Sequence, residues 1–420
     1  MLTRIKGTQD ILDLTIQKFI LNKVRKHLAQ YNFTEIMTPI LERAELFQRA
    51  VGQETDIVSK EMYFIEANQE DDERTTLRPE ITASIVRAYL NNNIQQVPWK
   101  VFAYGPVFRH ERPQKGRWRE FEQISIEVIG TQSVASDAYF ITMLDRLFHE
   151  SLKLEQYALV INYLGCKDDR ANFRNALYKY LGEHENEICA TCKVRKEKNI
   201  LRVLDCKNEQ CKALYAKAPV ITDYLCGQCM EEWKALQNYL QELSVSFTHS
   251  PMLVRGLDYY EKTIFEFVDM GTLGSQSTFC GAGRYELAQT IGNKKPVPSM
   301  GAGLGVGRLV MMLDAIKDRL PLEQQPALHL VVPFSQEQYS LGLQVADELH
   351  ARGLCVDLLA EGASLKSMLR KANDAGAATA ILLGVDEQKG GYATVKYMKL
   401  GTEAKITLKD LASTLTNNLS

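Results

Sequence analysis

The sequence predicts a mixed α/β protein of two domains: an α+β domain with an antiparallel sheet over residues 1–325, and an α/β domain over residues 326–420. A chain of 420 residues is too long for one ordinary domain. Two segments of alternating hydrophobicity flank a charged loop at 109–119, which is typical of an antiparallel hairpin. Beyond Pro326, short strands and helices alternate, which indicates a small and largely parallel sheet.

The larger domain should begin with an amphipathic helix, because apolar residues recur at helical spacing over 14–31. The further elements expected, in order, are strand 34–41 interrupted by Pro39, helix 81–90, strands 100–108 and 121–129, strands 253–260 and 263–268, and helix 308–316. Residues 167–248 differ in character, with six of the nine cysteines and a helical segment at 231–243, so we expect an inserted helical region.

The smaller domain has the more regular pattern. Its expected strands are 328–332, 355–359 and 379–383, and its expected helices are 337–351 and 365–375.

Composition excludes several classes of protein. Hydrophobic residues at 45% and charged residues at 24% are typical of a globular chain, and exclude wholesale disorder or a fibrous repeat. No apolar run approaches the roughly 18 residues of a spanning helix, and the polar N-terminus lacks the core of a secretory signal. We therefore expect a cytoplasmic protein without a membrane partner. The net charge of −2 by itself disfavours a nucleic-acid partner.

The loop at 109–119 carries five Lys/Arg and one Glu, a local net charge of +4. Cations held between two strands could converge on a polyphosphate or a nucleic-acid backbone, and the planar fork of arginine suits phosphate. A solvated hairpin tip is the alternative, and charge alone does not decide between them.

Polar residues also occur inside predicted strands. Gln123 and Glu127 share one face of their strand, where they could bind an ammonium or another donor-rich molecule, or could simply lie exposed. Arg255, in an otherwise apolar stretch, needs an anionic partner, which could be Asp258 or an anionic ligand. The glycine-rich segment 301–308 lacks the acidic residue that a dinucleotide-binding fingerprint requires, so that interpretation is rejected.

The cysteines form two CxxC pairs, Cys189 with Cys192 and Cys226 with Cys229. Four thiolates in such pairs can hold a structural Zn²⁺, and these four are the candidate metal ligands. Reduced thiols packed in a small helical region are the alternative. The odd total and the crowding fit a cytosolic protein better than a secreted disulfide scaffold.

Six ordered segments together resemble the signature motifs of class II aminoacyl-tRNA synthetases, in detail those of the histidyl-tRNA synthetase family. Residues 6–11 resemble the family's opening, 38–42 its motif 1, 108–127 motif 2, 301–308 motif 3, and 253–260 and 283–285 its two histidine-specific motifs. The α/β domain is similar to the family's anticodon-binding module. The resemblance implies an antiparallel catalytic sheet and a homodimer with Pro39 at its interface.

The implied chemistry is ligation of L-histidine to the 3′ end of tRNA(His), with ATP and Mg²⁺, through a histidyl-adenylate. Arg109 would hold the α-phosphate and Arg308 the γ-phosphate, Glu111 would help place ATP or its magnesium, and Arg255 would act as a fixed cation between the phosphate and the substrate carboxylate. The residues implied to bind histidine are Glu80, Thr82 and Gln123 for its backbone groups, and Glu127, Tyr260 and Tyr285 for its imidazole.

Three departures from the family pattern are Gly307 before Arg308, Glu286 after Tyr285, and Ala282 within a glycine run. A regulatory paralogue that binds histidine without charging tRNA is the main rival, but such chains tend to lose the anticodon module and the histidine-specific motifs. Residues 193–217 carry eight Lys/Arg and three Asp/Glu, so the insertion is a candidate clamp on tRNA.

Overall fold

The computed structural model describes residues 2–52, 55, 57–66, 74–257, 259–274, 277–323, 326–360 and 364–417. The chain divides into two compact units, Met1–Leu322 and Glu323–Ser420, with a division three residues before the predicted boundary. In the described part of the chain, no helix combines the length and the apolarity that a membrane crossing requires.

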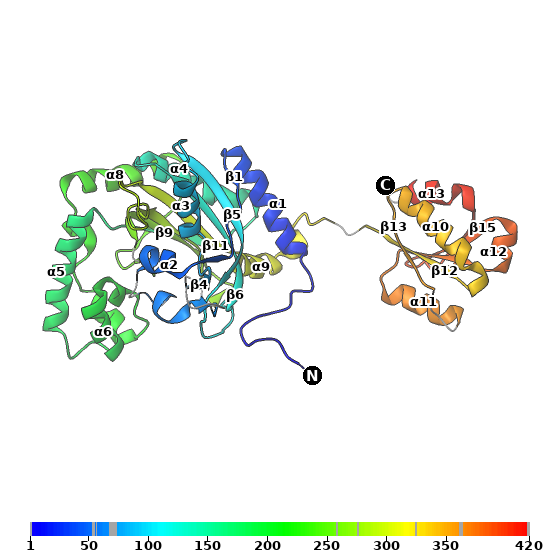
Figure 1. The fold of residues 1–420 in the computed structure, drawn as a ribbon, viewed down its shortest axis with the longest axis horizontal. Coiled ribbons are helices and arrows are strands. Elements are labelled where there is room, and N and C mark those ends of the chain that lie inside the picture. The colour runs from blue at the N-terminus through cyan, green and yellow to red at the C-terminus, as the bar shows by residue number, and fades with distance from the viewer. Residues whose placement is uncertain are drawn as a thin grey trace. The chain divides into compact units, whose positions relative to one another are not determined.

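The first unit is built on an eight-stranded sheet (Figure 1). Its strands, in spatial order, are β1 (Thr34–Glu35), β5 (Trp99–Phe108), β6 (Glu120–Ile129), β11 (Ser299–Gly305), β10 (Thr278–Tyr285), β9 (Tyr260–Asp269), β7 (Tyr157–Tyr163) and β8 (Thr248–His249). All neighbours are antiparallel except the two edge pairs, β1 with β5 and β7 with β8. The predicted antiparallel sheet and the β5–β6 hairpin are thus confirmed.

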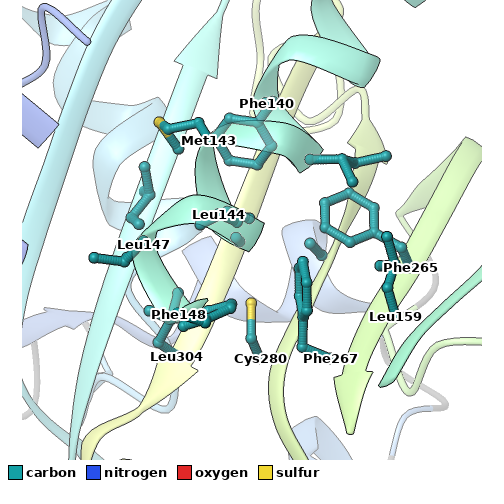
Figure 2. Packing of buried hydrophobic residues seen from close by; sticks show 14 of the residues in the cluster. Phe140, Met143, Leu144, Leu147, Phe148, Leu159, Phe265, Phe267, Cys280 and Leu304 are labelled. Carbon is teal, nitrogen blue, oxygen red and sulfur yellow. The ribbon is translucent and has the colours of Figure 1, made fainter. Parts of the chain in front are cut away.

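One face of this sheet carries the main apolar core. The helices that contribute to it are α1 (Thr15–Gln30), α4 (Val134–Arg146), α8 (Gly227–Glu242) and α9 (Val306–Asp314). Figure 2 shows Phe140 and Leu144 of α4 near Phe265 and Phe267 of β9. Even-numbered residues of β6, such as Ile124 and Ile126, belong to this core, so its odd-numbered residues face the opposite side.

The opposite face holds a second core and the polar residues of β6. Helices α2 (Ala44–Val51) and α3 (Thr82–Asn91) pack there with Tyr285 of β10. A three-stranded sheet of β2 (Leu41–Arg43), β4 (Thr75–Leu77) and β3 (Tyr63–Phe64) belongs to the same unit. Gln123 and Glu127 occupy this face, as their even separation predicted.

The predicted insertion is helical. It comprises α5 (Lys167–Glu183), α6 (Ala190–Lys198), α7 (Glu209–Tyr215) and, at its end, α8; the short helix η3 (Ile200–Asp205) lies between α6 and α7. Its own core includes Phe173, Leu177, Val203 and Tyr215. Figure 1 shows α5 and α6, in green, at one end of the first unit.

Two predicted strands differ from the structure. Residues 253–257 and Tyr259 form turns and irregular backbone rather than a strand, and β9 begins only at Tyr260. The predicted strand 34–41 is two short strands with irregular backbone around Pro39 between them, because proline removes a backbone donor. The irregular loop allows Arg255 to reach into the site described below, rather than alternate on a sheet.

The second unit has a five-stranded sheet in the order β13 (Cys355–Leu358), β12 (Leu328–Pro333), β14 (Thr379–Leu383), β15 (Tyr392–Tyr397) and β16 (Glu403–Thr407). Its helices are α10 (Tyr339–Ala351), α11 (Leu365–Asp374), α12 (Val385–Gly390) and α13 (Leu408–Asn417). The first three strands are parallel, as predicted, but β14, β15 and β16 pair antiparallel. The connection through α12 is too short for a parallel crossover, which needs a dozen or more residues.

Candidate active site

A cavity of about 310 Å³ opens on the α2–α3 side of the large sheet. Eight of the predicted site residues line it: Glu80, Thr82, Arg109, Glu111, Gln123, Arg255, Tyr260 and Arg308. They come from α3, β6, β9, α9 and the loops that join these elements. Glu127 and Tyr285 do not line the cavity but are buried against Thr82 at its floor.

One end of the cavity is rich in cations. The Arg109 Nε donates to the carbonyl of Pro79 at 2.8 Å, and its guanidinium lies 5.4 Å from the ring centroid of Phe121. The Arg308 Nε donates to the carbonyl of Gly116 at 3.1 Å. Burial, followed by the nearby charges of Arg117 and Arg109, lowers the pKa of Arg308 to about 10. Like charges crowded in this way favour an anionic ligand, which would relieve their repulsion.

Arg255 is held at this end by a carboxylate that the sequence had not indicated. It forms an ion pair with Glu266 of β9, whose other oxygen accepts from the Thr278 hydroxyl at 2.7 Å. Burial opposes the charge of Arg255, but Glu266 raises its pKa above the ordinary value. A Cβ at Gly281 would collide with the guanidinium of Arg255 where it now lies, so the glycine leaves room for this cation.

Gly307, which precedes Arg308, lies against the large side chain of Trp118. A Cβ at Gly307 would meet the Trp118 ring at 3.0 Å, which is tighter than ordinary contact. Trp118 comes from the basic loop, whose Glu111 and Arg117 form an ion pair beside the cavity. The indole of Trp118 therefore fills the space that a side chain at position 307 would occupy.

The other end of the cavity is acidic and phenolic, and it adjoins the first where the Tyr260 ring lies 5.4 Å from the guanidinium of Arg255. Glu127 is buried, and its two carboxylate oxygens accept from the Thr82 hydroxyl at 2.6 Å and from the Tyr285 hydroxyl at 2.7 Å. Burial raises the pKa of Glu127 to about 8, although both hydrogen bonds oppose the shift. A Cβ at Gly301, its cross-strand partner on β11, would lie 1.7 Å from the carboxylate.

Glu80 and Gln123 stand beside this carboxylate. Glu80 accepts from the backbone N–H groups of Thr82 at 2.7 Å and Ala83 at 2.8 Å, and so caps the start of α3. Burial raises the pKa of Glu80 above its ordinary value. Gln123 donates to the Ser125 hydroxyl at 2.7 Å. Glu80 and Gln123 both keep polar atoms at the cavity wall.

A matching family model covers most of the chain. The Histidyl-tRNA synthetase family model matches residues 13–309, and the Anticodon binding domain model matches residues 329–418. The chain belongs to the histidyl-tRNA synthetase family. Its resemblance to this family and the predicted fold class, an α+β catalytic domain followed by an anticodon-binding α/β domain, are confirmed.

Similar proteins agree with this assignment. The chain is 40% identical to the histidine–tRNA ligase of Halothermothrix orenii over 97% of each chain. It is also 40% identical to that of Aquifex aeolicus, over 97% of this chain and 99% of the relative. Among solved structures, the apo histidyl-tRNA synthetase of S. aureus is similar with a TM-score of 0.79 and 29% identity, over 99% of both chains.

The structure of this histidyl-tRNA synthetase family member adds cavity residues that the sequence reasoning missed. They are Arg117, Trp118, Phe121, Tyr259, Glu266 and Gly281. Glu266 could have been found from the sequence, because its carboxylate stands between Phe265 and Phe267 in the apolar middle of β9. Tyr259 could not have been found in this way, because it meets Tyr285 only in the folded chain. The two ring centroids are 5.6 Å apart in an edge-to-face arrangement, and the tilted ring of Tyr260 lies 4.6 Å away. Asp258, the suggested partner of Arg255, lies outside the described residues.

The structure does not bring the four cysteines of the two CxxC pairs together into one group. The described residues contain two separate groups with metal-ligand geometry, one of Cys189, Cys192, Cys206 and Cys211, and one of Cys166, Asp169, Cys226 and Cys229. Each CxxC pair therefore belongs to a different group. Sequence spacing could not show this, because the start of α5 supplies Cys166 and Asp169 to one group, and the segment from the end of η3 into α7 supplies Cys206 and Cys211 to the other.

Proposed function

We propose that the chain is a histidine–tRNA ligase that activates L-histidine with ATP in the cavity of its first unit and then transfers the histidyl group to tRNA(His). Ligase activity is that of the family to which the chain belongs. The observation that carries the site assignment is the polarity of one cavity, with Arg109, Arg255 and Arg308 at one end and the Glu127–Tyr285 pair below the other.

The arginine end suits the triphosphate of ATP. Arg109 would hold the α-phosphate and Arg308 the γ-phosphate, while Arg255, fixed by Glu266, would stabilise charge that develops when the histidine carboxylate attacks phosphorus. Such fixed cations need no reorganisation during the reaction. Glu111 and Glu266 offer the carboxylate oxygens that would hold Mg²⁺, whose charge would neutralise the departing pyrophosphate.

The acidic end suits histidine. The Thr82 hydroxyl donates to Glu127, so its oxygen is left to accept from the substrate ammonium, together with Glu80 and Gln123. A neutral imidazole has one donor and one acceptor nitrogen. We assign the donor nitrogen to Glu127, with Tyr285 on the same carboxylate, and the acceptor nitrogen to the hydroxyl of Tyr260.

Transfer RNA would engage the second unit and the insertion. The second unit matches an anticodon-binding domain. On the insertion, Lys193, Lys207 and Lys217 are exposed and could contact phosphates. Lys196 is unsuited to this role, because it is buried, lies 3.5 Å from a carboxylate oxygen of Glu185 and sits over the Tyr178 ring.

A homodimer would use the surface around Pro39. Met37 is 90% exposed and Leu41 is 55% exposed, and Ile40 beside them is also exposed. Apolar side chains gathered on one surface favour a protein interface. Light scattering should give twice the chain mass for the protein and the single mass for Met37→Glu/Leu41→Lys.

The reduced thiols and the tRNA substrate suit a cytoplasmic location.

Histidine-dependent ATP–pyrophosphate exchange tests the catalytic assignment. The purified protein with Mg²⁺ should exchange pyrophosphate into ATP only when L-histidine is present, and should charge tRNA(His). Histidine binding without exchange would instead indicate the regulatory paralogue. Exchange that depends on another amino acid would refute the assignment of the acidic end.

A further inference from the structure

Four cysteines meet within the helical insertion. Cys189 and Cys192 lie at the start of α6, Cys206 directly follows η3, and Cys211 lies in the first turn of α7. Cys192, Cys206 and Cys211 are buried and Cys189 is partly exposed. None of the four takes part in a disulfide. Neither the cavity nor the ligase reaction uses them.

The four sulfur atoms lie close enough together to share one metal ion. All four Sγ atoms lie within 4.8 Å of one another, and those of Cys189 and Cys206 are 3.8 Å apart. A disulfide needs about 2.05 Å, whereas Zn–S bonds of about 2.3 Å in a tetrahedron place sulfurs about 3.8 Å apart. The backbone N–H of Cys189 also donates to the Cys211 Sγ at 3.3 Å, an interaction that stabilises a thiolate.

The charge around the cluster suits a metal bound by thiolates. Four thiolates and one Zn²⁺ carry a net charge of −2. The segment 193–217, which includes two of the ligands, has eight Lys/Arg against three Asp/Glu. The surrounding cations therefore offset the charge of the loaded site.

We propose that Cys189, Cys192, Cys206 and Cys211 bind one structural Zn²⁺. Four protein ligands complete a tetrahedron and leave no open position, so the ion has a structural role. Each thiol gives up its proton on binding, which couples zinc affinity to pH. The ion would tie together α6, with nine residues, and α7, with seven, which are too short to be stable alone.

The second cysteine group supplies a matched background for the test. Cys166 and Cys226 are the N-cap residues of α5 and α8, and serine is among the preferred residues at that position. The double variant Cys166→Ser/Cys226→Ser therefore removes two possible ligands there and places a residue that suits each N-cap position. Any zinc that remains in this variant can then be assigned to the first group, Cys189, Cys192, Cys206 and Cys211.

Zinc is measured by elemental analysis in the full-length double variant, purified without added metal or chelator. We expect about one zinc per chain, and about none after Cys206→Ser is added to the same background. Replacement by Co²⁺ should give the sulfur-to-metal charge-transfer absorption of a thiolate site. Zinc below about 0.2 per chain in the folded double variant would overturn the proposal. Zinc that survives Cys206→Ser would overturn it as well.

Discussion

The two ends of the cavity balance their charges in opposite ways. At the cationic end, Arg308 lies near Arg109 and Arg117, and its pKa is lowered to about 10 by burial and this crowding. At the acidic end, Glu127 accepts from two hydroxyl donors, and burial raises its pKa to about 8. The first end is prepared for an anion by repulsion among cations. The second end suits a weakly basic side chain, because the hydrogen-bonded carboxyl group of Glu127 readily takes up a proton.

Removal of the fixed cation should have the largest effect. Arg255→Ala is expected to lower the exchange rate by about 10²–10³-fold, because it removes charge stabilisation at the reacting phosphate. Arg255→Lys should restore little, since an ammonium lacks the planar fork that meets Glu266. Steady-state exchange kinetics measure both variants, with circular dichroism as the fold control. Near-normal exchange in Arg255→Ala would refute its role.

The glycines beside the two ends allow each end to be disturbed separately. In Gly281→Ala the new methyl would collide with the guanidinium of Arg255, and in Gly301→Ala with the carboxylate of Glu127. We expect Gly281→Ala to lower kcat, and Gly301→Ala to raise the KM for histidine about tenfold or more with less effect on the KM for ATP.

Gly303→Ala is the matched control on β11. Its methyl would lie 3.2 Å from the Gln123 amide, a contact that a small shift of the side chain relieves. We expect its KM for histidine to stay within about threefold of the original value. Equal effects of Gly301→Ala on both substrates would contradict the separation of the two ends.

The raised pKa of Glu127 predicts a pH dependence of stability. Between about pH 4.5 and 8, the folded state keeps a proton that the unfolded chain releases, so the free energy of unfolding falls as pH rises. The slope approaches about 1.4 kcal/mol per pH unit for one such group. Glu127→Gln cannot titrate. Urea unfolding at pH 5 and pH 8 should show that its free energy of unfolding falls with pH less steeply than that of the original chain, by about this slope. An equal decline in both proteins would contradict a raised pKa.

The smallest expected effect concerns tRNA. Lys193→Gln/Lys207→Gln/Lys217→Gln should weaken tRNA(His) binding several-fold and reduce the salt dependence of log Kd by about 2, if all three contact phosphates. Histidine-dependent exchange should not change, because these lysines do not line the cavity. Unchanged tRNA affinity would rule out the clamp.

Local pattern predicted the elements whose hydrophobic periodicity is complete within their own residues. Helices α1 and α3 and the β5–β6 hairpin begin and end within a residue or so of the ranges expected from hydrophobic periodicity. The strand expected at 253–260 failed, because Arg255 leaves the apolar pattern to meet Glu266 across the cavity. The conformation of a loop that supplies a site residue is set by the contacts of that residue, and not by the alternation of side chains on a sheet.

The sequence by itself determined the fold class, the family and eight of the side chains that line the cavity, since these follow from periodicity and from ordered motifs. The tertiary structure decided which of those side chains meet. Thr82 and Tyr285 are far apart in the chain, yet both donate to Glu127. The CxxC pairs, which resemble one site in sequence, separate into two groups. Contacts between residues so far apart in the sequence depend on how the strands and helices pack, and local sequence patterns do not predict them.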